Sequence, residues 1–156
     1  MPRTADDWFD AYGHSHQDPL NKAIHWVCVP MITLTLVALL WSIPLGPVAA
    51  IAPWFNWSFV LIAIAVVFYL RLSLSIAIGM SVLVAAGIGM ILAWEACVPF
   101  PLWPIALGLF LLSWVAQFVG HKIEGEKPSF LEDIQFLLVG PAWLMHFIYR
   151  RIGIPY

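Results

Sequence analysis

The chain has 156 residues, of which 62% are hydrophobic and 10% are charged, and its formal net charge at pH 7 is −2. Soluble domains contain roughly 45–50% apolar and roughly 25% charged residues, so the core of one domain this size cannot hide the excess apolar surface, which must face lipid. We therefore predict an integral membrane protein with a single membrane domain, 1–156, and the few basic residues exclude a nucleic-acid partner.

Apolar segments without charged residues predict four transmembrane helices. Residues 23–70 contain no Asp, Glu, Lys or Arg and are interrupted by Pro and Gly between 44 and 53. Because a helix needs about 20 residues to cross about 30 Å of hydrocarbon, this stretch holds two spans. Residues 72–94 and 96–120 are also uncharged. The expected spans lie near 24–43, 55–71, 73–94 and 102–120.

A fifth apolar stretch, 134–149, is interrupted by Gly140 and Pro141. It is too short to cross the bilayer comfortably, so we expect a re-entrant or interfacial helix near 129–149. The predicted fold class is all-α: an integral membrane bundle of four transmembrane helices plus this C-terminal helix.

The distribution of basic residues predicts the orientation. With four spans, both termini lie on one side, and all seven Lys and Arg fall on that side. Since positive charge is retained in the cytoplasm, both termini are expected there, in the inner membrane of a bacterium or the endoplasmic reticulum of a eukaryote. The seven residues are Arg3, Lys22, Arg71, Lys122, Lys127, Arg150 and Arg151.

Four of the five histidines meet at this cytoplasmic surface in the predicted topology. His14, His16 and His25 precede or open the first span, and His121 closes the fourth. Neutral imidazoles ligate transition metals, so the sequence predicts a metal site, and five histidines suit one metal ion rather than two. For His25 and His121 taken singly, a structural hydrogen bond explains the position equally well. His14 is also explained as a solvated side chain, and His146 as a packed or snorkelling one.

Two polar blocks resemble a known family. The first contains Tyr12, His16-Gln17-Asp18-Pro19-Leu20-Asn21 and His25, and the second is Gln117-Phe118-Val119-Gly120-His121-Lys122-Ile123-Glu124-Gly125. Together they resemble the small membrane Fe(II)-dependent 2-hydroxy fatty acid dioxygenases, a family that includes a yeast enzyme of phytosphingosine metabolism. The resemblance implies a non-haem iron dioxygenase of fatty-acid α-oxidation, which uses O₂ to cleave a 2-hydroxy fatty acid between C1 and C2.

The resemblance also implies site residues. It makes His16, His25 and His121 the iron ligands. Gln17 follows His16 where the family pattern has a second histidine, so His14 is the candidate to replace that imidazole.

Four further residues are candidate catalytic groups. Lys122 is a candidate for binding the substrate carboxylate, and Tyr12 and Asn21 for hydrogen bonds to the ligands or to the 2-hydroxyl. Glu124 lies three residues after His121. It is the fourth candidate, without an assigned role.

Two other functions fit parts of the sequence. A non-catalytic lipid-binding or scaffold membrane protein accounts for the spans, although not for the histidines gathered on one face. A metal- or proton-coupled transporter needs ionisable groups inside the membrane, and between Trp54 and Trp94 there is only Arg71. The sequence favours the enzyme, with membrane lipid as its surroundings.

Overall fold

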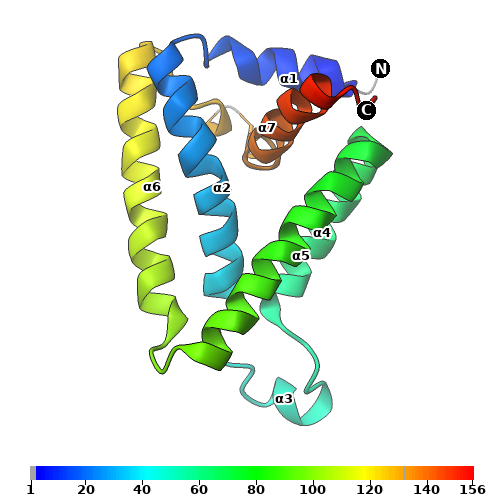
Figure 1. Ribbon diagram of the computed structural model, residues 1–156, viewed down its shortest axis with the longest axis vertical. Coiled ribbons are helices and arrows are strands. Elements are labelled where there is room, and N and C mark those ends of the chain that lie inside the picture. Colours follow the sequence, from blue (N-terminus) through cyan, green and yellow to red (C-terminus); the bar gives the residue numbers. More distant parts are fainter. Residues whose placement is uncertain (1–2, 132) are drawn as a thin grey trace.

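A computed structural model describes residues 3–131 and 133–156. These residues form seven α-helices and one 3-10 turn, with no strand among them. The all-α prediction is therefore confirmed (Figure 1). The helices are α1 (Ala5–His14), α2 (Pro19–Trp41), α3 (Val48–Ile51), α4 (Trp57–Leu72), α5 (Leu74–Cys97), α6 (Leu102–Glu124) and α7 (Phe136–Ile152), and the 3-10 turn is η1 (Ser129–Leu131).

Three helices are long and apolar enough to cross a membrane, namely α2, α5 and α6, with 23, 24 and 23 residues. At 1.5 Å per residue each measures about 35 Å, which exceeds the hydrocarbon thickness. The fourth expected span, near 55–71, corresponds to α4, which is apolar but has only 16 residues and reaches about 24 Å. Membrane association is thus supported by three helices, and the fourth span stays a prediction.

The long helices form two pairs that diverge from one end of the molecule (Figure 1). Helices α2 and α6 lie side by side, and α4 and α5 form the second pair. At the narrow end the pairs meet through a small core of Val37, Ala38, Ile91 and Ala106.

Helix α7 occupies the wide end, beneath α1 (Figure 1). Its buried residues, including Val139, Ala142 and Trp143, belong to the main hydrophobic core together with Phe9 and Tyr12 of α1. Two tyrosine hydroxyls attach it to the second pair: Tyr69 of α4 donates to the Leu138 carbonyl (3.0 Å), and Tyr149 donates to the Ser75 carbonyl (2.7 Å). The expected helix near 129–149 corresponds to α7, which begins later, at Phe136, because residues 129–131 form η1, and which ends later, at Ile152; residue 132 lies outside the described residues.

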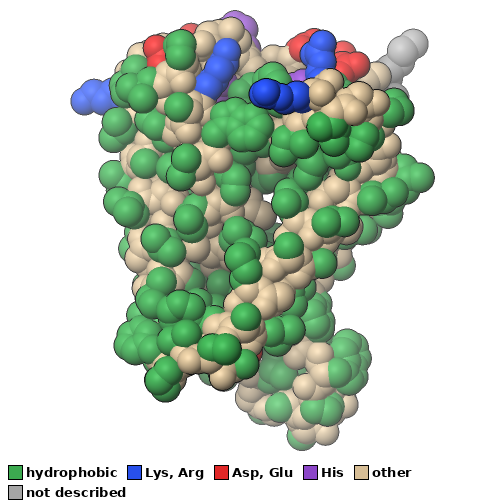
Figure 2. Space-filling model, in the orientation of Figure 1, with side chains coloured by type: hydrophobic (Ala, Val, Ile, Leu, Met, Phe, Trp, Pro, Cys, Tyr) green, Lys and Arg blue, Asp and Glu red, His purple; other side chains and the backbone are tan. Residues whose placement is uncertain are grey.

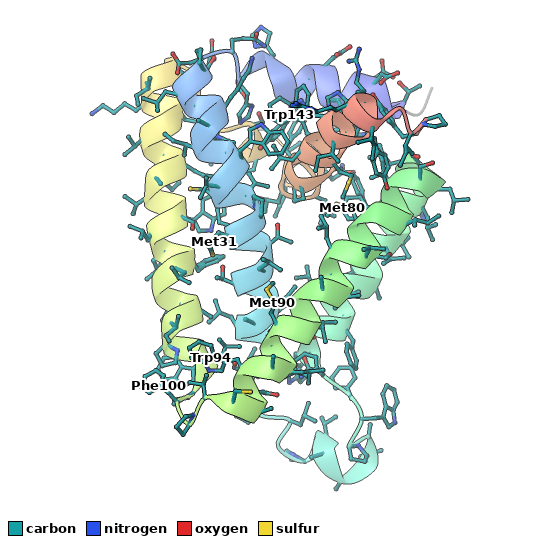
Figure 3. All side chains as sticks on the ribbon, in the orientation of Figure 1. Met31, Met80, Met90, Trp94, Phe100 and Trp143 are labelled. Carbon is teal, nitrogen blue, oxygen red and sulfur yellow. The ribbon has the colours of Figure 1, made fainter. Side chains whose placement is uncertain are left out.

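Charged side chains gather at the wide end (Figure 2). In this view the Lys and Arg side chains, most acidic side chains and the visible histidines lie there, while hydrophobic side chains cover the rest of the molecule. Trp94 and Phe100 lie at the opposite end from Trp143 (Figure 3). The structure therefore has one polar end and a long apolar body.

Candidate metal centre

Three histidines meet at the wide end of the α2–α6 pair. His16 follows α1, His25 lies in the second turn of α2, and His121 lies in the last turn of α6. Their ring centroids are 4.2 Å (His16–His25), 4.9 Å (His16–His121) and 5.0 Å (His25–His121) apart, and one nitrogen from each lies within 4.8 Å of the others. All three are buried. We call His16, His25 and His121 the histidine cluster.

Backbone carbonyls orient two of these rings. Nδ1 of His16 lies 2.6 Å from the Tyr12 carbonyl, and Nδ1 of His25 lies 2.9 Å from the Asn21 carbonyl. Because a carbonyl only accepts, each Nδ1 carries the proton and each Nε2 keeps a free lone pair. Both Nε2 atoms are buried without a hydrogen-bond partner, as is Nδ1 of His121. Buried unpartnered nitrogens are costly, and three imidazoles that each bring one nitrogen within 4.8 Å of the others fit the ligand set of a transition metal.

Burial also keeps the His16 ring neutral. It lowers the pKa of His16 to about 3, with the neighbouring His25 as the next cause. Neutral imidazole is the form that ligates metals, so His16 stays competent to bind a metal well below neutral pH.

The start of α2 fixes the positions of His16 and His25. Asp18 caps the helix, its Oδ1 accepting from the backbone N–H groups of Leu20 and Asn21 at 2.8 and 3.1 Å, and Pro19 occupies the first turn. His25 then lies one turn after Asn21, with its ring against the Asn21 carbonyl. The cap therefore sets where α2 begins and which face carries His25.

Glu124 joins this turn to the end of α6. Its Oε1 accepts from the backbone N–H of Gln17 (2.7 Å), and its Oε2 accepts from the backbone N–H of Asp18 (2.8 Å) and from Nδ2 of Asn21 (3.0 Å). Both carboxylate oxygens are thus engaged by residues more than a hundred positions away in the chain. Glu124 holds His16 and His121 in register without belonging to the cluster.

Close approach of α2 and α6 depends on Gly120. A Cβ at this position would collide with Oδ1 of Asn21, a side chain with no exposed surface. The glycine before His121 therefore allows the Asn21 amide to lie between the helices, where Nδ2 also donates to the Ser15 carbonyl (3.3 Å). The Asn21 amide thus holds the start of α2 against α6.

The other residues named from the sequence lie in different surroundings. Tyr12 is buried, and its ring stacks on His16 at 4.2 Å. His14 and Lys122 are exposed and do not join the cluster. His146 is buried but separate from the cluster. Its ring stacks on Phe9, and its Nδ1 is hydrogen-bonded to the Trp143 carbonyl at 2.8 Å. The structure thus brings together three of the four proposed ligands and leaves His14 outside.

A small cavity of about 40 Å³ lies beside the cluster, lined by His25, His121 and Tyr12. Gln117, to which the sequence analysis gave no role, also lines this cavity. Gln117 lies four residues before His121 on α6, and this spacing predicts that the two side chains share one face of the helix. Trp143, 5.5 Å from the His16 ring, was also missed, because nothing local in the sequence places α7 beneath α1.

Comparison with known proteins gives one match. The family model described as 2-hydroxy-palmitic acid dioxygenase Mpo1-like matches residues 3–152, nearly the whole chain. No curated protein and no solved structure matches.

Proposed function

The chain belongs to this Mpo1-like family, and from that premise we propose that it is an Fe(II)-dependent dioxygenase that shortens a 2-hydroxy fatty acid by one carbon. The observation that carries the proposal is the histidine cluster, whose three buried unpartnered nitrogens suit a metal ion. The family description supports the class of substrate, and the donor set supports the metal chemistry.

His16, His25 and His121 would hold the metal. Fe(II) held by these three imidazoles would supply the O₂ chemistry of the overall reaction, in which the 2-hydroxy acid and O₂ give the acid shorter by one carbon, CO₂ and water. The protein contributes the position and the dry surroundings. The core around Tyr12 and Trp143 excludes water from one side of the cluster.

Tyr12 and Gln117 are suited to orient the substrate head group. Both line the cavity beside His25 and His121. Burial raises the pKa of Tyr12, so its hydroxyl remains protonated and can donate a hydrogen bond to a carboxylate. Lys122 is exposed, so we assign it no direct contact with the substrate. Asn21 and Glu124 act as positioning residues through their shared hydrogen bond.

The single domain is proposed to span the membrane four times, through α2, α4, α5 and α6. With four spans both termini lie on the side of the polar end, which the basic residues make cytoplasmic. Helix α7 then lies at the interface. In this arrangement a fatty acid keeps its tail in the bilayer while its head group reaches the cluster.

Oxygen uptake tests the proposal. Purified protein in liposomes with Fe(II) is given four acids, long and short, each with and without the 2-hydroxyl. The long 2-hydroxy acid should consume O₂ and give the acid one carbon shorter, whereas the plain acid loses the chelating hydroxyl and should not. Oxygen uptake at the same rate with and without the 2-hydroxyl, or oxygen uptake that requires 2-oxoglutarate, contradicts the proposal. Binding of the acid without uptake would instead support a non-catalytic lipid-binding protein.

A further inference from the structure

A large apolar cavity opens between the two helix pairs. Its volume is about 730 Å³, within the range of roughly 300–1,000 Å³ typical of small-molecule sites. Side chains of α2, α4, α5, α6 and the start of α7 line it, and Met80 on α5 lies at its α7 end (Figure 3). The space-filling view shows the surface hollowed between the pairs, with hydrophobic side chains around the hollow (Figure 2).

The three hydroxyl groups that line this cavity all donate to backbone carbonyls. The hydroxyl of Thr33 donates to the Val29 carbonyl (2.9 Å), and that of Ser81 to the Ala77 carbonyl (2.7 Å). The Tyr69 hydroxyl is likewise bonded to α7. An occupant of the cavity therefore meets hydrocarbon and no hydroxyl in need of a partner, which suits an apolar chain and disfavours a polar ligand.

The apolar cavity adjoins the small cavity at the histidine cluster. Five residues line both. The apolar space thus ends beside His25, His121, Tyr12 and Gln117, where the polar groups available to a ligand are found. The shared residues are Ile32, Thr33, Trp114, Leu137 and Pro141.

From this continuity we propose that the large cavity is the binding site for the acyl chain of the substrate, with the head group at the histidine cluster. The assignment rests on the proposed function for the identity of the head group. A long unbranched acid matches a site with one polar end and an apolar remainder. The walls between α2, α4 and α5 then set the length of chain that the protein accepts.

Photocrosslinking tests the site without requiring turnover. The probe is 2-hydroxypalmitic acid carrying a diazirine near its terminal carbon, added to the full chain in liposomes and mapped by peptide mass spectrometry. We expect adducts on the cavity residues of α4 and α5, and these adducts should disappear when unlabelled 2-hydroxypalmitic acid is in excess. Adducts spread evenly over the lipid-facing helices, or adducts not removed by competition, overturn the proposal.

Two neighbouring alanines of α5 provide a matched pair of variants. Both side chains are in the exposed class, but Ala85 lines the large cavity and Ala86 lines none of the cavities described above. Ala85→Phe should lower the competed adduct yield about tenfold, within the range of about 5- to 150-fold that overpacking a filled site typically costs. Ala86→Phe should leave the yield unchanged. Equal yields in the two variants contradict the proposal, and adduct mapping on the unaltered chain remains decisive if Ala85→Phe does not fold.

The outcomes separate this inference from the proposed function. Competed adducts in the cavity without oxygen uptake would keep the acyl-chain site and refute the dioxygenase. Oxygen uptake with adducts elsewhere would keep the dioxygenase and refute the acyl-chain site. If both proposals are correct, Ala85→Phe also lowers the rate of oxygen uptake more with 2-hydroxypalmitic acid than with the shorter 2-hydroxyoctanoic acid.

Discussion

Glu124→Gln tests how the start of α2 is held against the end of α6. The carboxylate accepts three hydrogen bonds, one at Oε1 from Gln17 and two at Oε2 from Asp18 and Asn21. An amide oxygen at the Oε2 position can keep two of them, and its NH₂ group then faces the Gln17 N–H, donor against donor. Hydrogen bonds to charged groups contribute about 1.5–3 kcal/mol, and Glu124 is only partly buried, so we take the loss as about 1.4 kcal/mol.

We expect this loss to weaken metal binding, because the hydrogen bonds of Glu124 hold the histidine cluster in place. Because about 1.4 kcal/mol corresponds to a factor of ten, the Fe(II) affinity of Glu124→Gln should fall about tenfold, with all three imidazoles still present. The affinity is measured by competition with a chromophoric chelator. Glu126→Gln is the matched control, since Glu126 is exposed two residues further along the chain. If both variants bind Fe(II) as tightly as the unaltered protein, Glu124 does not position the cluster.

Three further predictions follow from the same geometry. Alanine at any one position of the histidine cluster should remove most of the bound iron, whereas His14→Ala should keep it; metal analysis in which His14→Ala loses iron as well would restore His14 as a ligand. Gly120→Ala should lower the free energy of unfolding by about 1 kcal/mol, because overpacking of about 1–3 kcal/mol outweighs a helix-propensity gain of about 1 kcal/mol; Gly108→Ala, in open space, should show only the gain in thermal unfolding. In a cysteine-free background, Ala49→Cys should react with an impermeant thiol reagent from outside and Glu126→Cys should not, and the reverse labelling would invert the topology.

The histidine cluster was accessible from sequence because the expected four-span topology places its members at one surface. With an even number of spans, the residue that opens the first span and the residue that closes the last would lie at the same surface, and in the structure α2 and α6 pack side by side. His25 and His121 illustrate this, and their ring centroids lie 5.0 Å apart. The boundary between the second and third expected spans was also accessible, because Arg71 interrupts the apolar run there; in the structure Ser73 alone separates α4 from α5 and caps α5 through its Oγ.

The contacts that hold the cluster in place were less accessible. A carboxylate three residues after His121 is visible in the sequence, but its partners are two backbone N–H groups and an amide across the helix pair, which no local pattern specifies. Helix α1 did carry a signal, because Thr4 and Asp7 form a capping box that marks its start. Where α1 lies depends on tertiary packing against α7, and sequence periodicity contains no information about that partner.

Helix α7 behaves as a spacer for the whole molecule. It lies against α5 so closely that a Cβ at Gly79 would collide with the Tyr149 hydroxyl, and Tyr69 holds it to α4. The angle at which the helix pairs diverge is therefore set by α7, which is synthesised after the helices that it separates. Until α7 is in place, the earlier helices lack the contacts through Tyr69 and Gly79 described here, so we expect a nascent chain that ends near Gln135 to close its apolar hollow and to open it only when α7 packs between the pairs.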